Sequence, residues 1–213
     1  MPAEERAIPS VWADTLLQRL REHGVRDLCL APGSRSAPLA LAAGRCLEAG
    51  VGLRVHTHFD ERGLGFYALG LSRATGRPTA LITTSGTAVP NLHPALTEAA
   101  ESHVPLIAVT ADRPPELHGC GANQTIQQPG VFAAQCRSEL RLPAPDPQLG
   151  TAWLCRRIDA ALAPALAGAD GGPVHINAPF REPLYAPPAA APERPAPPAR
   201  SEEHTSELQS LSH

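Results

Sequence analysis

Short apolar runs alternate along the chain with longer stretches in which apolar residues recur every three or four positions. The strand-like runs are 25–31, 53–59, 79–84, 105–111 and 173–178, with a weaker one at 137–142. Helical patterns lie between them at 36–49, 60–75, 88–102 and 148–166. Strands alternating with helices at this spacing predict βαβ units. We therefore predict an α/β fold, a doubly wound parallel sheet flanked by helices.

An amphipathic helix is predicted ahead of the first strand. Val11, Leu16, Leu17 and Leu20 recur at helical spacing, and Ser10 precedes them as a candidate N-cap. Gly24 is a natural stop for this helix.

The composition changes at residue 183. Proline and alanine dominate 183–200, which predicts a semi-rigid linker after a domain at 1–182. The polar stretch 201–213 has no apolar periodicity, and with Arg200 its start resembles the translation of a sequencing-adapter oligonucleotide. We expect a non-native tail on a gene model cut short; the alternative is a native polar terminus.

Composition excludes several kinds of chemistry. All 18 basic residues are arginine, so neither a Schiff-base lysine nor a P-loop lysine is available. The net charge of −3 gives no electrostatic reason to expect nucleic acid or an anionic membrane as partner. The five cysteines are scattered and odd in number, which argues against a disulfide framework. Without a signal peptide or an apolar run of about 20 residues, we expect a cytoplasmic protein with no membrane span.

Four polar segments directly follow predicted strands, at 31–36, 60–63, 85–87 and 111–126. In open parallel sheets, ligands bind beyond the carboxyl ends of the strands. The sequence therefore predicts a binding site along this edge.

In the first segment, Gly33 allows a tight turn, Ser34 and Ser36 are candidate helix caps, and Arg35 is suited to gripping a carboxylate or phosphate. An ordinary turn with a solvated arginine explains the same residues equally well.

In the second segment, His56 and His58 fall on one face of a predicted strand, but no third metal ligand lies nearby, so we assign no metal site. Asp60 and Glu61 open a helix, where carboxylates commonly complement the helix dipole. By the residues alone, this structural role is sufficient for Glu61.

The remaining two segments contain further candidates. Ser85-Gly86-Thr87 lacks the G-x-S-x-G pattern, which favours a close-approach turn at a helix start over a hydrolase nucleophile. The long segment after the 105–111 strand offers Arg113, Asn123 and Gln124 as polar groups. A loop of this length favours function over a surface excursion.

Five segments together resemble a known family. They are APGSRSAPLALA (31–42), HTHFDERGLGFYALGLS (56–72), TSGTAVPNLHPALTEA (84–99), TADRPPELHGCGANQTIQQPG (110–130) and GGPVHINAPFREPLY (171–185). The chain resembles the thiamine-diphosphate-dependent carboligases of menaquinone biosynthesis, in order from about Pro9 to Tyr185. Pro90 stands where that pattern has alanine, which predicts a shifted helix start.

The resemblance implies a reaction and a set of roles. Members of this family decarboxylate 2-oxoglutarate on thiamine diphosphate and add the succinyl unit to isochorismate. The domain here would be the pyrimidine-binding one, in which Glu61 contacts a pyrimidine nitrogen and promotes the imino tautomer. The implied substrate-binding residues are Ser34, Arg35, Arg113, Asn123 and Gln124, and the implied cofactor-binding residues are Glu61, Gly86, Thr87 and Gln124.

The resemblance also implies groups outside this chain. The diphosphate of thiamine diphosphate and the Mg²⁺ would be held by a separate domain with a GDG…N motif, which the sequence lacks. The active site would form between subunits of a homo-oligomer, at least a dimer, so the chain alone is expected to be inactive. Two alternatives stay open: a non-catalytic binding or interaction module of the same fold, and a nucleotide-binding Rossmann protein, which the absence of G-x-G-x-x-G disfavours.

Overall fold

The computed structural model describes residues 3–185. Six parallel strands form one sheet in the order β2-β1-β3-β4-β6-β5. The strands are β1 (Asp27–Leu30), β2 (Arg54–Thr57), β3 (Thr79–Thr83), β4 (Leu106–Asp112), β5 (Ser138–Arg141) and β6 (Val174–Pro179). The predicted fold class is confirmed. The predicted tail, and the predicted linker beyond its first three residues, lie outside the described residues.

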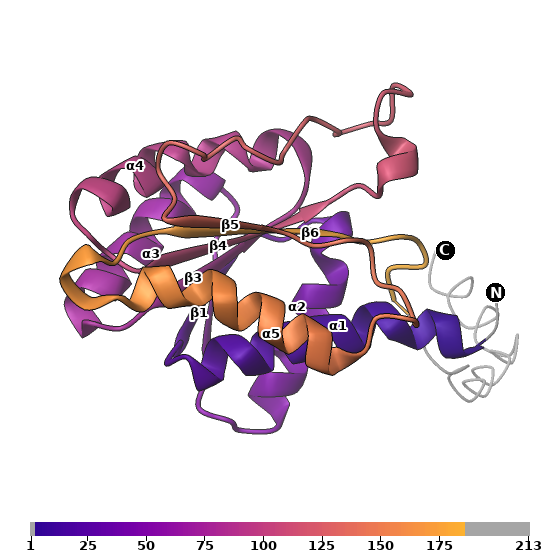
Figure 1. The fold of residues 1–213 in the computed structure, drawn as a ribbon, viewed down its shortest axis with the longest axis horizontal. Helices are drawn as coiled ribbons and strands as arrows, with labels where there is room; N and C mark the ends of the chain where they lie inside the picture. The colour runs from indigo at the N-terminus through magenta and orange to yellow at the C-terminus, as the bar shows by residue number, and fades with distance from the viewer. Residues whose placement is uncertain (1–2, 186–213) are drawn as a thin grey trace, which may run out of the picture.

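Helices cover both faces of the sheet (Figure 1). They are α1 (Ala3–Glu22), α2 (Ala37–Glu48), α3 (Glu61–Thr75), α4 (His93–Glu101) and α5 (Thr151–Leu162). One apolar core joins the sheet to α1, α2 and α5, and a second joins it to α3 and α4. Within residues 3–185, no helix is both long enough and apolar enough to cross a membrane.

The two faces of the sheet differ near the carboxyl ends of the strands. On the α1/α2/α5 face, the side chains there are apolar, as at Ile82 and Ala111. On the α3/α4 face, Thr83, Thr110 and Asn177 are buried at the corresponding positions. Since side chains alternate between faces along a strand, the polar positions all point to one face. Thr110 and Asn177 are hydrogen-bonded to each other, whereas Thr83 Oγ1 is buried without a partner among the described residues.

The first helix differs from its prediction. Helix α1 begins at Ala3, so Ser10 lies inside it and is no N-cap. Its buried stripe runs through Trp12, Leu16 and Leu20, four residues apart, whereas Val11 is 45% exposed. The predicted stop is confirmed, because Gly24 has φ +93°, a conformation that suits glycine.

Two other helices begin later than the sequence pattern predicts. Helix α4 begins at His93 rather than at residue 88, after two 3₁₀ turns, η2 (Gly86–Ala88) and η3 (Pro90–Leu92). Pro90 and Pro94 lack amide hydrogens and so suit only first turns. The shift expected from Pro90 is therefore confirmed. Helix α5 begins at Thr151 rather than at residue 148.

Candidate functional site

The four predicted polar segments meet at the carboxyl edge of the sheet. The strands that they follow, β2, β1, β3 and β4, are consecutive neighbours in the sheet. Adjacent strands lie about 4.8 Å apart, so the ends of β2 and β4 are separated by roughly 14 Å. The segments therefore line one continuous edge, with Glu61 at one end and Arg113 at the other.

Glu61 is the first residue of α3. Asp60 caps this helix, because its Oδ1 accepts a hydrogen bond from the Gly63 amide at 2.6 Å. By helical periodicity, Glu61 lies on the stripe that α3 turns toward the sheet. The buried members of that stripe are Leu64, Gly65, Ala68, Leu69 and Ser72. Glu61 is half-buried, and its carboxylate makes no hydrogen bond or ion pair with any residue in the described part of the chain.

Exposed aromatic side chains flank Glu61 along the chain. Phe59 is 85% exposed, and Phe66 and Tyr67 are 46% and 47% exposed. The Tyr67 hydroxyl lies 3.2 Å from His56 Nδ1, and His56 Nε2 lies 2.9 Å from Asp27 Oδ1. His56 is thus engaged by its neighbours, and His58 lies just past the end of β2. We refer to Phe59, Phe66 and Tyr67 as the aromatic surface.

The turn after β1 is closely packed. A Cβ on Gly33 would lie 2.4 Å from Thr84 Cβ, so only glycine fits where this turn passes the end of β3. The predicted serine caps are wrong, because neither η1 (Ser34–Ser36) nor α2 has a side-chain cap. Ser36 Oγ donates to the Gly33 carbonyl instead, which keeps it within the 3₁₀ turn. Ser34 is exposed beside a pocket of about 660 Å³.

Arg35 is neither solvated nor a free anion clamp. Arg35 is only 4% exposed. Its Nη1 donates to the Phe180 carbonyl at 2.9 Å, and its Nη2 donates to Glu182 Oε1 at 3.1 Å. Its Nε is buried without a partner in the described residues. Burial lowers the pKa of Arg35, and the nearby positive charge of Arg113 lowers it further. Arg35 therefore ties the β1 turn to the end of β6, with its Nε left unpaired among the described residues.

The segment after β3 forms the predicted close-approach turn. Gly86 has φ +74°, and a Cβ there would lie 2.6 Å from Gln124 Cγ. Ser85 Oγ donates to the Gln124 carbonyl at 3.1 Å, and Gln124 Nε2 donates to the Ser85 carbonyl at 3.0 Å. Thr87 is exposed, and its carbonyl accepts from Asn91. The structure thus brings Gly86 and Gln124, two of the candidate cofactor-binding residues, into contact.

The long loop after β4 projects beyond the edge of the sheet (Figure 1). At its base, Arg113 Nη2 donates to the Asn123 carbonyl at 2.9 Å. The Asn123 side chain is exposed, and Gln124 has a left-handed φ of +54°. Arg113 therefore closes the loop and holds the Asn123–Gln124 turn near the end of β3.

A buried polar network beneath this loop was missed by sequence reasoning. Gln128 is 0% exposed and hydrogen-bonds to the Gly86 amide, the Ala111 carbonyl and Asn177 Oδ1. Asn177 in turn donates to Asp112 Oδ2 at 2.8 Å. Burial raises the pKa of Asp112, against the opposing effect of that hydrogen bond. The period-two polar residues His175 and Asn177 in an apolar strand were the available signal.

Glu61, Arg35 and Arg113 are not brought into one contact cluster. Arg35 and Arg113 influence each other electrostatically, whereas Glu61 lies at the β2 end of the edge. Among residues 3–185, no group of three or more His, Cys, Asp or Glu side chains is arranged to hold a metal ion.

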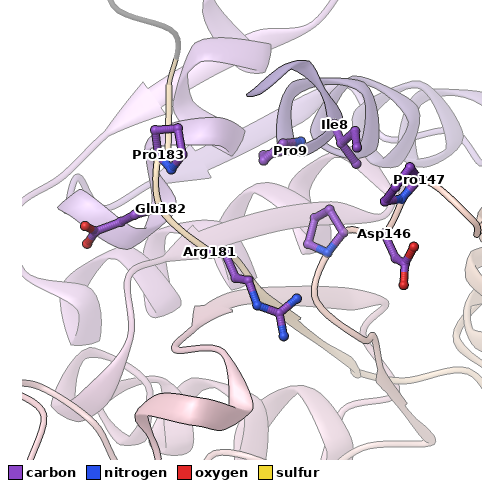
Figure 2. A pocket seen from close by; sticks show the side chains of 8 residues that line it. Ile8, Pro9, Asp146, Pro147, Arg181, Glu182 and Pro183 are labelled. Atoms are coloured by element: carbon purple, nitrogen blue, oxygen red, sulfur yellow. The ribbon is translucent and has the colours of Figure 1, made fainter. Parts of the chain in front are cut away.

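A pocket of about 370 Å³ has none of these three residues in its lining, although Glu182, the partner of Arg35, forms part of its wall (Figure 2). Its walls include Pro9, Pro145, Pro147 and Pro183, and its charged Arg181 is paired with Glu116. A second pocket, of about 320 Å³, lies under the long loop and includes Arg113, Asp112 and Asn177 in its lining. The second pocket contains the predicted site residue Arg113 in its lining, and the pocket of about 660 Å³ described above contains Ser34.

The family is shown by comparison with known proteins. The family model described as "Thiamine pyrophosphate enzyme, N-terminal TPP binding domain" matches residues 11–134, more than half of the chain. The chain therefore belongs to the thiamine pyrophosphate enzymes, and the resemblance noted in the sequence is confirmed.

The individual relatives carry one name. The chain is 58% identical over 200 residues to the 2-succinyl-5-enolpyruvyl-6-hydroxy-3-cyclohexene-1-carboxylate synthase of Halorhodospira halophila, covering 89% of this chain and 36% of that protein. It is 54% identical over 174 residues to the synthase of the same name from Yersinia pseudotuberculosis. That match covers 82% of this chain and 29% of the Yersinia protein. The chain thus spans about a third of the length of these curated relatives.

Proposed function

We propose that the whole protein is a thiamine-diphosphate-dependent 2-succinyl-5-enolpyruvyl-6-hydroxy-3-cyclohexene-1-carboxylate synthase. It would decarboxylate 2-oxoglutarate and transfer the succinyl unit to isochorismate in menaquinone biosynthesis. The observation that carries the proposal is the placement of Glu61, on the inward stripe of α3 at the carboxyl edge, in a chain 58% identical to a synthase of that name.

The local chemistry of Glu61 fits the pyrimidine ring of thiamine diphosphate. A half-buried carboxylate without a partner among the described residues is available to share a proton with a ring nitrogen. When bound, the cofactor supplies the electron sink for decarboxylation, and the protein supplies placement and electrostatics. Glu61 would hold the proton at the pyrimidine nitrogen, and the Asp60 cap would fix the helix that carries it.

The other end of the edge suits the substrates. Both proposed substrates carry carboxylates, and arginine forks bind carboxylates through paired N–H donors. Arg113, Ser34 and the exposed Asn123 are the groups that we assign to them, and the buried Arg35 would support the substrates from behind by holding the Ser34 turn. Gly86, Thr87 and Gln124 would lie against the cofactor, because the Gly86 turn brings backbone close to the site.

We further propose that the diphosphate and Mg²⁺ are held by a separate domain of a partner subunit. The aromatic surface supports such an assembly, since exposed aromatic side chains are enriched at protein interfaces. It lies beside Glu61 on the outer edge of the sheet, where a second subunit could complete the site. A cytoplasmic location is part of the same proposal.

Substitution of Glu61 in the full-length protein tests the function. Glu61→Gln keeps the size and removes the proton-sharing carboxylate, so we expect carboligation to fall by about 10²–10⁴-fold. Exposed Glu48 at the end of α2 offers the matched control Glu48→Gln, which should leave the rate unchanged. Product formation from 2-oxoglutarate and isochorismate is the measurement. An unchanged rate in Glu61→Gln would contradict the proposed role.

A further inference from the structure

The side chain of Gln128 joins three separate segments of the chain. Its Oε1 accepts a hydrogen bond from the Gly86 amide at 2.9 Å. Its Nε2 donates to the Ala111 carbonyl at 3.1 Å and to Asn177 Oδ1 at 2.9 Å. Gln128 thus connects the long loop to the end regions of β3, β4 and β6. It uses its oxygen and both amide hydrogens in doing so.

The burial of Gln128 makes these contacts obligatory. The residue is 0% exposed, so a missing partner would leave a polar group without water or protein to satisfy it. The contact to Gly86 also constrains the turn, because the Gly86 amide faces Gln128 while the chain beyond it follows the φ of +74° at Gly86. Gln128 therefore stabilises one particular conformation of the Gly86 turn.

The same turn contacts the loop residues assigned to the site. Gly86 packs against Gln124, and Ser85 exchanges two hydrogen bonds with Gln124. The adjacent Asn123 carbonyl accepts from Arg113. A shift of the Gly86 turn would therefore be transmitted to Gln124 and, through the chain, to Asn123 and Arg113.

We propose that Gln128 is a positioning residue, which sets the Gly86 turn and the Asn123–Gln124 turn in the geometry that substrate binding requires. Gln128 would not touch substrate or cofactor; it acts through the residues above it. The inference rests on the proposed function as far as substrate binding is concerned. The part concerning loop geometry stands on the hydrogen bonds alone.

Two controls make the test specific. Gln128→Met keeps the approximate length of the side chain and removes all of its hydrogen bonds, including a long one of 3.5 Å to Thr110 Oγ1. Gln148→Met makes the same chemical change at an exposed position just before α5, away from the network. Ile158→Ala truncates a fully buried residue of α5, on the opposite face of the sheet, and so destabilises the fold without touching the network.

The variants are compared in the full-length protein, at a temperature where circular dichroism shows all of them folded. We expect Gln128→Met to raise the KM for isochorismate about tenfold, which is the effect of roughly one net hydrogen bond. Amide hydrogen exchange of segments 84–92 and 119–130 should accelerate by a similar factor. Gln148→Met should change neither the KM nor the exchange rates by more than twofold, and Ile158→Ala should not accelerate exchange in these two segments selectively.

Different results overturn different claims. Gln128 has no positioning role if Gln128→Met changes both the KM for isochorismate and the exchange rates by less than twofold. The same conclusion follows if Ile158→Ala raises the KM as much as Gln128→Met does. If the unaltered protein shows no carboligation, the proposed function fails. In that case hydrogen exchange still decides whether Gln128 holds the two turns.

Discussion

Ser85 and Gln124 form a reciprocal pair of hydrogen bonds across the carboxyl edge of the sheet. The Ser85 hydroxyl donates to the Gln124 carbonyl at 3.1 Å, and the Gln124 amide donates to the Ser85 carbonyl at 3.0 Å. This pair ties the long loop to the end of β3 across 39 positions of sequence. It also supports Gln124 in a left-handed conformation, which a residue other than glycine seldom adopts.

The Gly86 turn can be tested with a matched pair of glycine substitutions. Gly86→Ala places a Cβ 2.6 Å from Gln124 Cγ at φ +74°, so we expect a loss of about 1–3 kcal/mol in the free energy of unfolding. Gly70→Ala lies inside α3 with nothing within 4 Å of the added methyl group, and it should stabilise by about 0.5–1 kcal/mol. Urea unfolding measures both; equal effects would contradict the close approach at Gly86.

Alanine substitutions of the two site arginines, Arg35 and Arg113, should differ in their effect on the free energy of unfolding. Arg35→Ala removes buried hydrogen bonds to Phe180 and Glu182, and should cost about 1.5–3 kcal/mol of unfolding free energy as well as raising substrate KM. Arg113→Ala removes a partly exposed side chain, so it should change stability little and should raise substrate KM about tenfold or more. Thermal unfolding and steady-state kinetics on the full-length protein are the measurements.

Arg181→Ala serves as the arginine control. Arg181 is half-exposed, and its ion pair is with Glu116 rather than with the assigned residues. It should change neither stability nor KM appreciably, because exposed ion pairs contribute little. An Arg35→Ala variant as stable as Arg181→Ala would refute the anchoring role of Arg35.

Burial of His175 predicts a pH dependence of stability. Burial lowers the pKa of His175 to about 4, against an ordinary value of 6.5. Between pH 6.5 and pH 4 the unfolded chain binds a proton at His175 that the folded protein does not. The contribution of neutral His175 to the free energy of unfolding is therefore complete above pH 6.5 and is lost as the pH falls to 4. The difference in pKa corresponds to roughly 3 kcal/mol. Urea unfolding at pH 7 and pH 4 measures this loss.

His175→Gln isolates that contribution. Glutamine does not titrate but can still hydrogen-bond to Thr110, the partner of His175 Nε2 at 2.8 Å. Carboxylates with lowered pKa values, such as Asp27 and the neighbouring Glu139, add acid sensitivity to both proteins. We expect the variant to lose about 3 kcal/mol less than the unaltered protein over this range. Parallel curves for the two would show that His175 does not titrate as its burial requires.

The helix cap before Glu61 gives a further prediction. Asp60→Ala removes the acceptor of the Gly63 amide and should cost about 1 kcal/mol of stability, as N-cap losses do. Asp60→Asn retains an acceptor oxygen and should cost less. Because Glu61 is the next residue, Asp60→Ala should also reduce carboligation beyond what Asp60→Asn does. Equal unfolding midpoints for the two variants would contradict the capping role.

The sequence pattern predicted most of the local structure for a clear reason. Strands and helices bury apolar residues at periods of 2 and 3.6, and these periods are visible without any fold. All six strands were located in this way, and Asp60 marked the start of α3 correctly. Starts governed by proline, such as that of α4, were placed less accurately, because 3₁₀ turns have no apolar period of their own.

What the amino-acid order determined was the class of fold, the edge that carries the polar segments, and the family motifs around Glu61, Arg113 and Gln124. Only the tertiary structure decided which of these groups are free and which are engaged with other parts of the chain. Arg35 is buried against the end of β6 and Gln128 is the centre of a hydrogen-bond network. Both depend on partners more than 40 residues away, and such pairings arise from packing rather than from local spacing.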